Sequence, residues 1–181
     1  MEKTLQGNSQ ARRPILHFTL ARGIGWGLLG GLVGTVAMDI VLIGASPVLG
    51  LNGIQSFSVI GDTAARFFAL LGAAMTGGVP TGLAVHYLAG PLLGAIFGAA
   101  VTRFNALWPG TLKKGSGLAI LYVELASQPL LATPPLLLNM NAQQTAFWYA
   151  LSFGMHLLWG GILGAVVSHG LRRMASRPPV R

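Results

Sequence analysis

The stretch GIGWGLLGGLVGTVAMDIVLIGA, residues 23–45, decides the class of this protein. It is almost entirely apolar, and Asp39 is its one ionisable residue. A helix needs about 20 predominantly apolar residues to cross the hydrocarbon core of a bilayer. The stretch is therefore predicted to be a transmembrane helix.

Three further stretches have a similar length and character. They occupy residues 81–101, about 115–138 and about 146–167. Lipid offers the backbone no hydrogen bonds, so a spanning segment must be a helix or part of a closed barrel, and the alternation typical of barrel strands is not visible. We therefore expect an all-α membrane protein whose residues 23–170 form a four-helix transmembrane domain.

The composition of the whole chain agrees with this class. Of its 181 residues, 52% are hydrophobic and only 9% are charged, whereas a soluble domain carries roughly 25% charged residues. This balance excludes a soluble enzyme, a disordered tail and a coiled coil, and enzymatic activity is not expected. The chain has no cysteine, which excludes disulfides, thiolate metal sites and cysteine nucleophiles.

A shorter apolar segment, residues 62–76, lies between the first two predicted spans. Asp62 or Thr63 is a suitable N-cap for a helix there, and the sequence Gly-Gly-Val-Pro at 77–80 separates the segment from the next span. An apolar run of this length is more often interfacial or re-entrant than spanning. We expect a short helix that lies at the membrane surface.

The basic residues are distributed unevenly. Four crossings place residues 1–22, the loop at 102–114 and residues 171–181 on one side of the membrane. Every Lys and Arg except Arg66 then lies on that side: Lys3, Arg12, Arg13, Arg22, Arg103, Lys113, Lys114, Arg172, Arg173, Arg177 and Arg181. Positive charge marks the cytoplasmic side, so we expect a bacterial-type inner-membrane protein with cytoplasmic basic tails at 1–22 and 171–181.

The same cations indicate which partners to expect. Basic residues beside spanning helices attract anionic lipid headgroups. Nucleic-acid binding is not expected, because it would need a folded basic surface that carries aromatic residues, and none is visible.

The second and fourth predicted spans resemble each other. HYLAGPLLGAI begins at His86 and HLLWGGILGAV begins at His156. In both, glycines follow the histidine at intervals of four, so that histidine and glycines lie along one stripe of the helix. Such stripes allow helices to approach closely in lipid. The likeness indicates a parallel two-plus-two repeat about an axis along the membrane normal.

Polar side chains recur within the predicted spans at Asp39, His86, Glu124, Gln128 and His156. Along helices that rise about 1.5 Å per residue, Asp39, His86 and His156 each lie about 25 Å from the basic residue at the cytoplasmic end of the helix. On the same scale, Glu124 lies about 15 Å and Gln128 about 21 Å from Lys114. We predict a common polar layer in the outer half of the bundle.

Three interpretations of this layer stay open. It can be a structural hydrogen-bonded network that fixes helix pairing, or a path for protons or a small solute, in which the histidines exchange protons near neutral pH. It can also be a cofactor site, in which His86 and His156 bind haem b or, with a carboxylate, a divalent metal. Because four helices are few for a monomeric transporter, we expect a homo-oligomer or a subunit of a membrane complex.

Several short motifs resemble the YagU-like inner-membrane proteins, a family defined by a domain without an assigned activity. They are His86 at the head of a glycine-bearing helix, Pro129 followed by Thr-Pro-Pro-Leu at 133–136, and His-Leu-Leu-Trp at 156–159 followed by Leu-Arg-Arg at 171–173. The resemblance covers roughly residues 81–174, and the chain departs from it at Glu124, where a histidine or neutral residue is expected. It implies a multi-helix inner-membrane architecture and no particular reaction.

Overall fold

The computed structural model of the protein describes residues 20–45, 48 and 52–175. All regular elements in this part of the chain are helical: α1 (Leu20–Ala45), α2 (Gly53–Leu70), α3 (Gly78–Arg103), the single 3-10 turn η1 (Asn105–Leu107), α4 (Leu112–Leu137) and α5 (Ala142–Ala175). The prediction of an all-α protein is confirmed.

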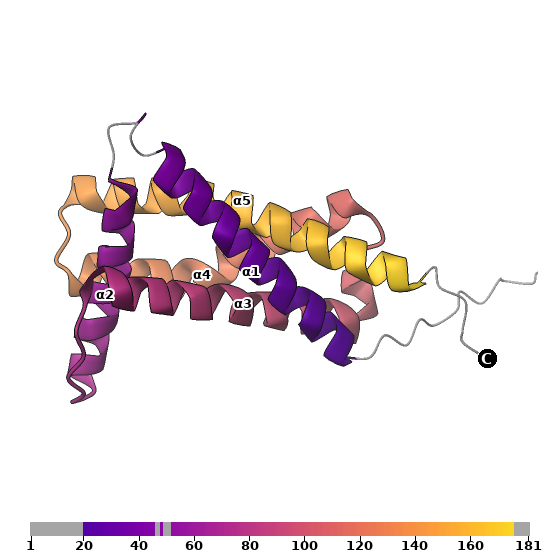
Figure 1. Cartoon of the computed structure of the whole chain (residues 1–181), viewed down its shortest axis with the longest axis horizontal. Helices are drawn as coiled ribbons and strands as arrows, with labels where there is room; N and C mark the ends of the chain where they lie inside the picture. The colour runs from indigo at the N-terminus through magenta and orange to yellow at the C-terminus, as the bar shows by residue number, and fades with distance from the viewer. Residues whose placement is uncertain (1–19, 46–47, 49–51, 176–181) are drawn as a thin grey trace, which may run out of the picture.

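The four long helices lie side by side, and α2 runs across them at the end where α1 and α4 finish (Figure 1). Helix α1 packs along both α3 and α5, and α5 also packs along α4. Helices α3 and α4 touch each other very little, whereas α2 packs mainly on α3. The arrangement is therefore a row in the order α3, α1, α5, α4 that closes only weakly between its first and last members.

Glycines bring α1 and α3 into backbone contact. A methyl group at Gly27 would collide with the carbonyl group of Gly94, and one at Gly98 would collide with the carbonyl oxygen of Gly23. Gly25, on the other side of α1, has open space around it. The stripe of small residues predicted from the sequence is thus the contact surface between two antiparallel helices.

The second pair of long helices packs in the same way. A methyl group at Gly164 of α5 would collide with the carbonyl oxygen of Gly115 of α4, and one at Gly160 would lie 2.8 Å from the Cα atom of Ile120. The glycine stripe of α3 therefore packs on α1, and that of α5 packs on α4, so each stripe meets the other long helix of its own half of the chain. Between the two pairs, Gly170 of α5 accommodates the indole ring of Trp26 of α1.

The apolar core fills the half of the bundle where α1 and α4 begin. Its buried members are Met38, Phe97, Val101, Ala119, Val123, Trp159, Leu163, Val167 and Leu171. Exposed cations lie around the same end, at the starts of α1 and α4 and the ends of α3 and α5: Arg22, Arg103, Lys113, Lys114, Arg172 and Arg173. The described part of the predicted basic side is thus gathered at one end of the bundle.

Three helices, α1, α3 and α5, are long and apolar enough to cross a membrane. Helix α4 has the same length as α1 and α3, 26 residues, but Glu124, Gln128 and Pro129 make its middle less apolar. Large apolar side chains are exposed along all four long helices, among them Leu32, Leu88, Leu125 and Phe153. An apolar exterior of this extent is what a bilayer solvates and water does not.

The prediction of a short helix at 62–76 is wrong in its bounds, because α2 starts at Gly53 and ends at Leu70. Asp62 does not cap it: the carboxylate oxygen Oδ1 accepts a 2.7 Å hydrogen bond from the backbone N–H of Gly78, at the start of α3. The chain leaves the helix at Gly72, whose φ of +80° favours glycine. The first turns of α2 form through packing, since Gly61 lies against the backbone of Gly78 and Gly82 against that of Phe57.

The long helices extend beyond the predicted apolar cores. Helix α5 continues from the predicted limit at Val167 to Ala175 and includes Arg172 and Arg173, because lysine and arginine are good helix formers and suit the last turn. Of the predicted basic tails, residues 1–19 and 176–181 lie outside the described residues.

Candidate functional site

A contact between a histidine and a carboxylate joins α1 to α3 near the end that α2 covers. The Nε2 atom of His86 lies 3.0 Å from Oδ1 of Asp39. Asp39 is buried and His86 is half-buried, and the ring of Phe57 of α2 meets the imidazole edge-on at 5.6 Å. The pair lies one step beyond the contact of Gly31 with the Gly90 carbonyl, so that the glycine stripes bring the two side chains together.

The second histidine has a partner on α4. The Nδ1 atom of His156 lies 3.1 Å from Oγ of Ser127, and the tautomer decides which of them donates. Ser127 is buried and one helical turn from Val123, which belongs to the core. Each of the two histidines therefore contacts a polar side chain of the other long helix in its half of the chain, His86 on α1 and His156 on α4.

A buried hydrogen-bonded group connects α5 to α1 beside these pairs. The indole Nε1 of Trp159 donates to the carbonyl oxygen of Gly31 at 3.1 Å and to Oγ1 of Thr35 at 3.2 Å. Thr35 in turn donates to the same carbonyl at 2.9 Å. Each polar atom has a partner, as burial in an apolar environment requires.

Both histidines line one cavity of about 410 Å³. Its wall is mostly apolar and comes from all five α-helices. The polar groups in it are Thr35, Thr63, His86, Ser127, Thr133, His156 and the indoles of Trp148 and Trp159. A largely apolar chamber of 300–1,000 Å³ with a few convergent polar groups is the usual form of a small-molecule site.

Three of the five polar residues singled out in the sequence do not line the cavity, and one of them, Asp39, contacts it through His86. Neither Glu124 nor Gln128 lines the cavity. Gln128 is exposed and its Nε2 donates back to the Glu124 carbonyl at 2.9 Å. Oε1 of Glu124 is buried and has no hydrogen-bond partner in the described part of the chain. Helical periodicity explains the difference, because α4 turns Val123 and Ser127 toward α5 and turns Glu124 and Gln128 away from the cavity.

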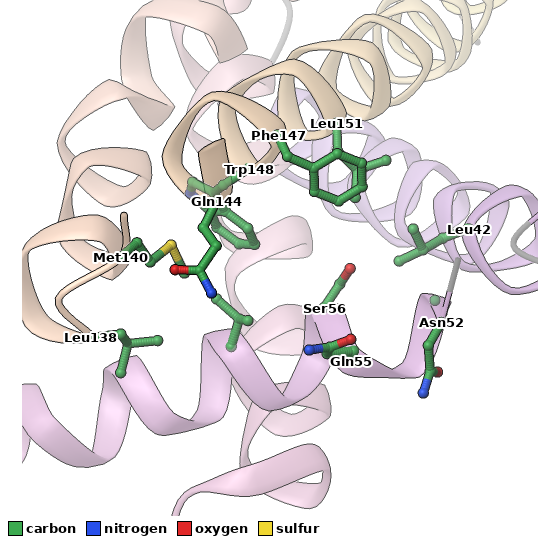
Figure 2. Close-up of a pocket in the computed structure, with 12 residues that line it drawn as sticks. Leu42, Asn52, Gln55, Ser56, Leu138, Met140, Gln144, Phe147, Trp148 and Leu151 are labelled. Carbon is green, nitrogen blue, oxygen red and sulfur yellow. The ribbon is translucent and has the colours of Figure 1, made fainter. Parts of the chain in front are cut away.

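A second cavity of about 340 Å³ adjoins the first at the end of the bundle. Figure 2 shows Asn52, which precedes α2, with Gln55 and Ser56 of α2 on one side of it and the start of α5 on the other. Trp148 lines both cavities, and its Nε1 donates to the Leu131 carbonyl at 3.1 Å. The indole of Trp148 is thus part of the wall between the two chambers.

The contacts of the two histidines bear on the metal site that the sequence allowed. Among the described residues, no three of His, Cys, Asp and Glu are grouped so that they could hold a metal ion. Oδ1 of Asp39 and Nε2 of His86 are engaged with each other, and Nδ1 of His156 is engaged with Ser127. These contacts favour a hydrogen-bonding site over a metal-binding one.

Sequence reasoning gave Trp159 no role in the site, although it carries the bonds between α5 and α1. The signal was helical spacing: Trp159 lies three residues after His156, and Thr35 lies four residues before Asp39. Residues at such intervals share a helix face.

This chain was compared with family models, curated proteins and solved structures, and no family model, curated protein or solved structure matches it.

Proposed function

We propose that this protein crosses the membrane four times and passes protons or a small solute by way of the histidine-lined cavity. The observation that carries the proposal is that His86 and His156, one from each half of the chain, open into the same chamber. Ionisable groups within a span are costly and mark many paths for solutes and protons.

The fourth crossing is supported by the pairing of α4 with α5. The two helices lie antiparallel along their length, from Gly115 against Gly164 at one end to Leu131 bonded by Trp148 at the other. A helix of 26 residues is about 39 Å long at 1.5 Å per residue, which exceeds the hydrocarbon thickness of about 30 Å. If α5 crosses, α4 crosses beside it.

The position of the cations supports an orientation. The exposed basic residues gather at the end where α1 begins and α5 finishes. We propose that this end faces the cytoplasm of a bacterial-type cell and that its cations contact anionic lipid headgroups. Helix α2 then lies at the outer surface. The resemblance to the YagU-like family supports the same inner-membrane location.

The two halves of the chain support a repeat. In each half, a histidine-headed helix packs by its glycines on the other long helix of that half, α3 on α1 and α5 on α4, and the histidine contacts a polar side chain of that helix. We propose a two-plus-two repeat with a substrate site between the halves. We also propose that copies of the chain associate through Gly117, Gly154 and Gly161, which have open space around them.

The cavity suits proton-linked passage, because an imidazole can accept a proton at one ring nitrogen and release one from the other, and a carboxylate oxygen of Asp39 lies 3.0 Å from Nε2 of His86. Buried Phe97, Val101 and Leu163 fill the bundle between the cavity and the cationic end. We therefore propose that this form of the protein is closed toward the cytoplasm. Passage then requires the helices to move apart in the half of the bundle that these apolar side chains fill.

The experiment is a flux measurement in proteoliposomes that contain a pH-sensitive dye. We expect pH-dependent proton flux from the wild-type protein and at least a tenfold loss in His86→Ala and in His156→Ala. His169→Ala is the matched control, because His169 is exposed near the cationic end of α5. Wild-type flux no greater than that of empty liposomes would overturn the proposal. Equal flux in all variants, with only stability lowered, would favour a structural network.

A further inference from the structure

The cavity lies on the side of the bundle where α3 and α4 face each other. Helices α3 and α4 have few contacts with each other, and both contribute to its wall. They meet nearer the cationic end, where the hydroxyl of Tyr122 donates to the Leu93 carbonyl at 3.0 Å and its ring packs on Phe97. Between this contact and α2, the cavity lies between α3 and α4, and their side chains do not fill the space.

Apolar side chains surround the opening. Phe67 and Phe68 of α2 and Leu130 of α4 line the cavity, yet they are 47%, 39% and 57% exposed. Side chains that line a chamber and are also exposed lie at its mouth. Since the long helices are apolar on their outer faces, this mouth faces acyl chains and not water. A ligand reaches the cavity from the bilayer, between α3 and α4.

The interior has hydrogen-bonding groups but no unbalanced charge. No Lys or Arg is among the described residues that line the cavity, and the carboxylate of Asp39 is already paired with His86. An anionic head group would lack a counter-ion here, and burying an unpaired charge is costly. A neutral head that donates and accepts hydrogen bonds meets His86, His156 and Ser127 without that cost.

From this geometry we infer that the ligand is a neutral amphiphile, with an apolar chain and a terminal hydroxyl-type group, that enters the cavity sideways from the lipid. The inference rests on the proposed function, since it names the class of solute that the cavity takes. The chain lies along Phe67, Phe68 and Leu130, and the head lies between the two histidines.

Fluorescence quenching tests the inference. Trp159 lines the cavity, so a protein with Trp26, Trp108 and Trp148 replaced by Phe reports on it alone. In nanodiscs, a brominated long-chain alcohol is expected to quench Trp159 saturably, and an excess of the unbrominated alcohol is expected to restore the fluorescence. The brominated carboxylate of the same length, kept ionised, is expected to bind at least tenfold more weakly.

A matched pair of variants localises the binding. Ala89→Phe places a ring in the cavity wall, and Ala84→Phe places one on an exposed position of the same helix outside it. We expect the first to weaken saturable quenching at least fivefold and the second to leave it unchanged. Non-saturable quenching, or no competition by the unbrominated alcohol, would overturn the inference even if Ala89→Phe fails to fold. Proton flux without alcohol binding would refute this ligand class alone, and alcohol binding without flux would refute only the passage function.

Discussion

His86 and Asp39 meet at 3.0 Å directly beyond the place where the backbones of α1 and α3 touch. The glycine stripes set the distance between the helices, and the contact between His86 and Asp39 lies where the stripes end. Packing and polar pairing are therefore coupled in this pair of helices.

We expect a double-mutant cycle on Asp39 and His86 to show this coupling. Asp39→Ala and His86→Ala each leave a buried partner without its hydrogen bond, so each single change costs about 1–3 kcal/mol of unfolding free energy. The double variant should cost less than their sum, with a coupling energy of about 0.6–2 kcal/mol as measured between membrane helices. Reversible unfolding in mixed detergent micelles measures it, and strict additivity would contradict the contact.

A matched pair of glycines tests the contact between α1 and α3. Gly27→Ala directs a methyl group at the carbonyl of Gly94, whereas Gly25→Ala on the same helix meets nothing within 4 Å. We expect the first variant to lose about 1–3 kcal/mol through overpacking and the second to stay within about 0.5 kcal/mol of the wild type. Thermal unfolding followed by circular dichroism checks both. Equal losses would mean that α1 and α3 are not in close contact.

Four crossings are tested by the reactivity of single cysteines, which the chain allows because it has none of its own. The two changes are Ala106→Cys and Asn139→Cys. Ala106 lies near the cationic end, Asn139 lies between α4 and α5 at the opposite end, and both residues are exposed. In intact cells we expect an impermeant maleimide to label position 139 and not 106. After the inner membrane is opened, both should react. Labelling of both positions from the same side would refute the crossing by α4.

The sequence was most informative where a pattern repeats at the helical period. The glycines after His86 and His156 define a face of each helix, and those faces are the contact surfaces in the structure. The estimated height along each helix grouped Glu124 and Gln128 with the histidines, but height does not tell which way a side chain faces, and α4 turns both away from the cavity. Periodicity also missed the first half of α2, since that segment is helical through its packing on α3 and not through its own propensity.

Trp148 forms part of the wall between the two cavities, and this wall is testable. In a background of Trp26→Phe and Trp108→Phe, Trp148→Phe keeps an aromatic ring in place and Trp148→Ala removes it. Trp159 is then the remaining tryptophan in both proteins. The second cavity lies at the end covered by α2, which we place at the outer surface, so opening the wall should admit a water-soluble quencher.

We expect acrylamide to quench Trp159 at least twice as strongly in the Trp148→Ala protein as in the Trp148→Phe protein. The Trp148→Ala protein should also lose about 2–3 kcal/mol of unfolding free energy. This loss is near the lower limit for removal of a large aromatic side chain, because the side chain of Trp148 is only half-buried. Stern–Volmer titration below the unfolding temperature of both proteins separates access from unfolding. Phe147→Ala is the control, because Phe147 lines the second cavity but not the first. Equal quenching in the alanine and phenylalanine proteins at position 148 would mean that another group separates the chambers.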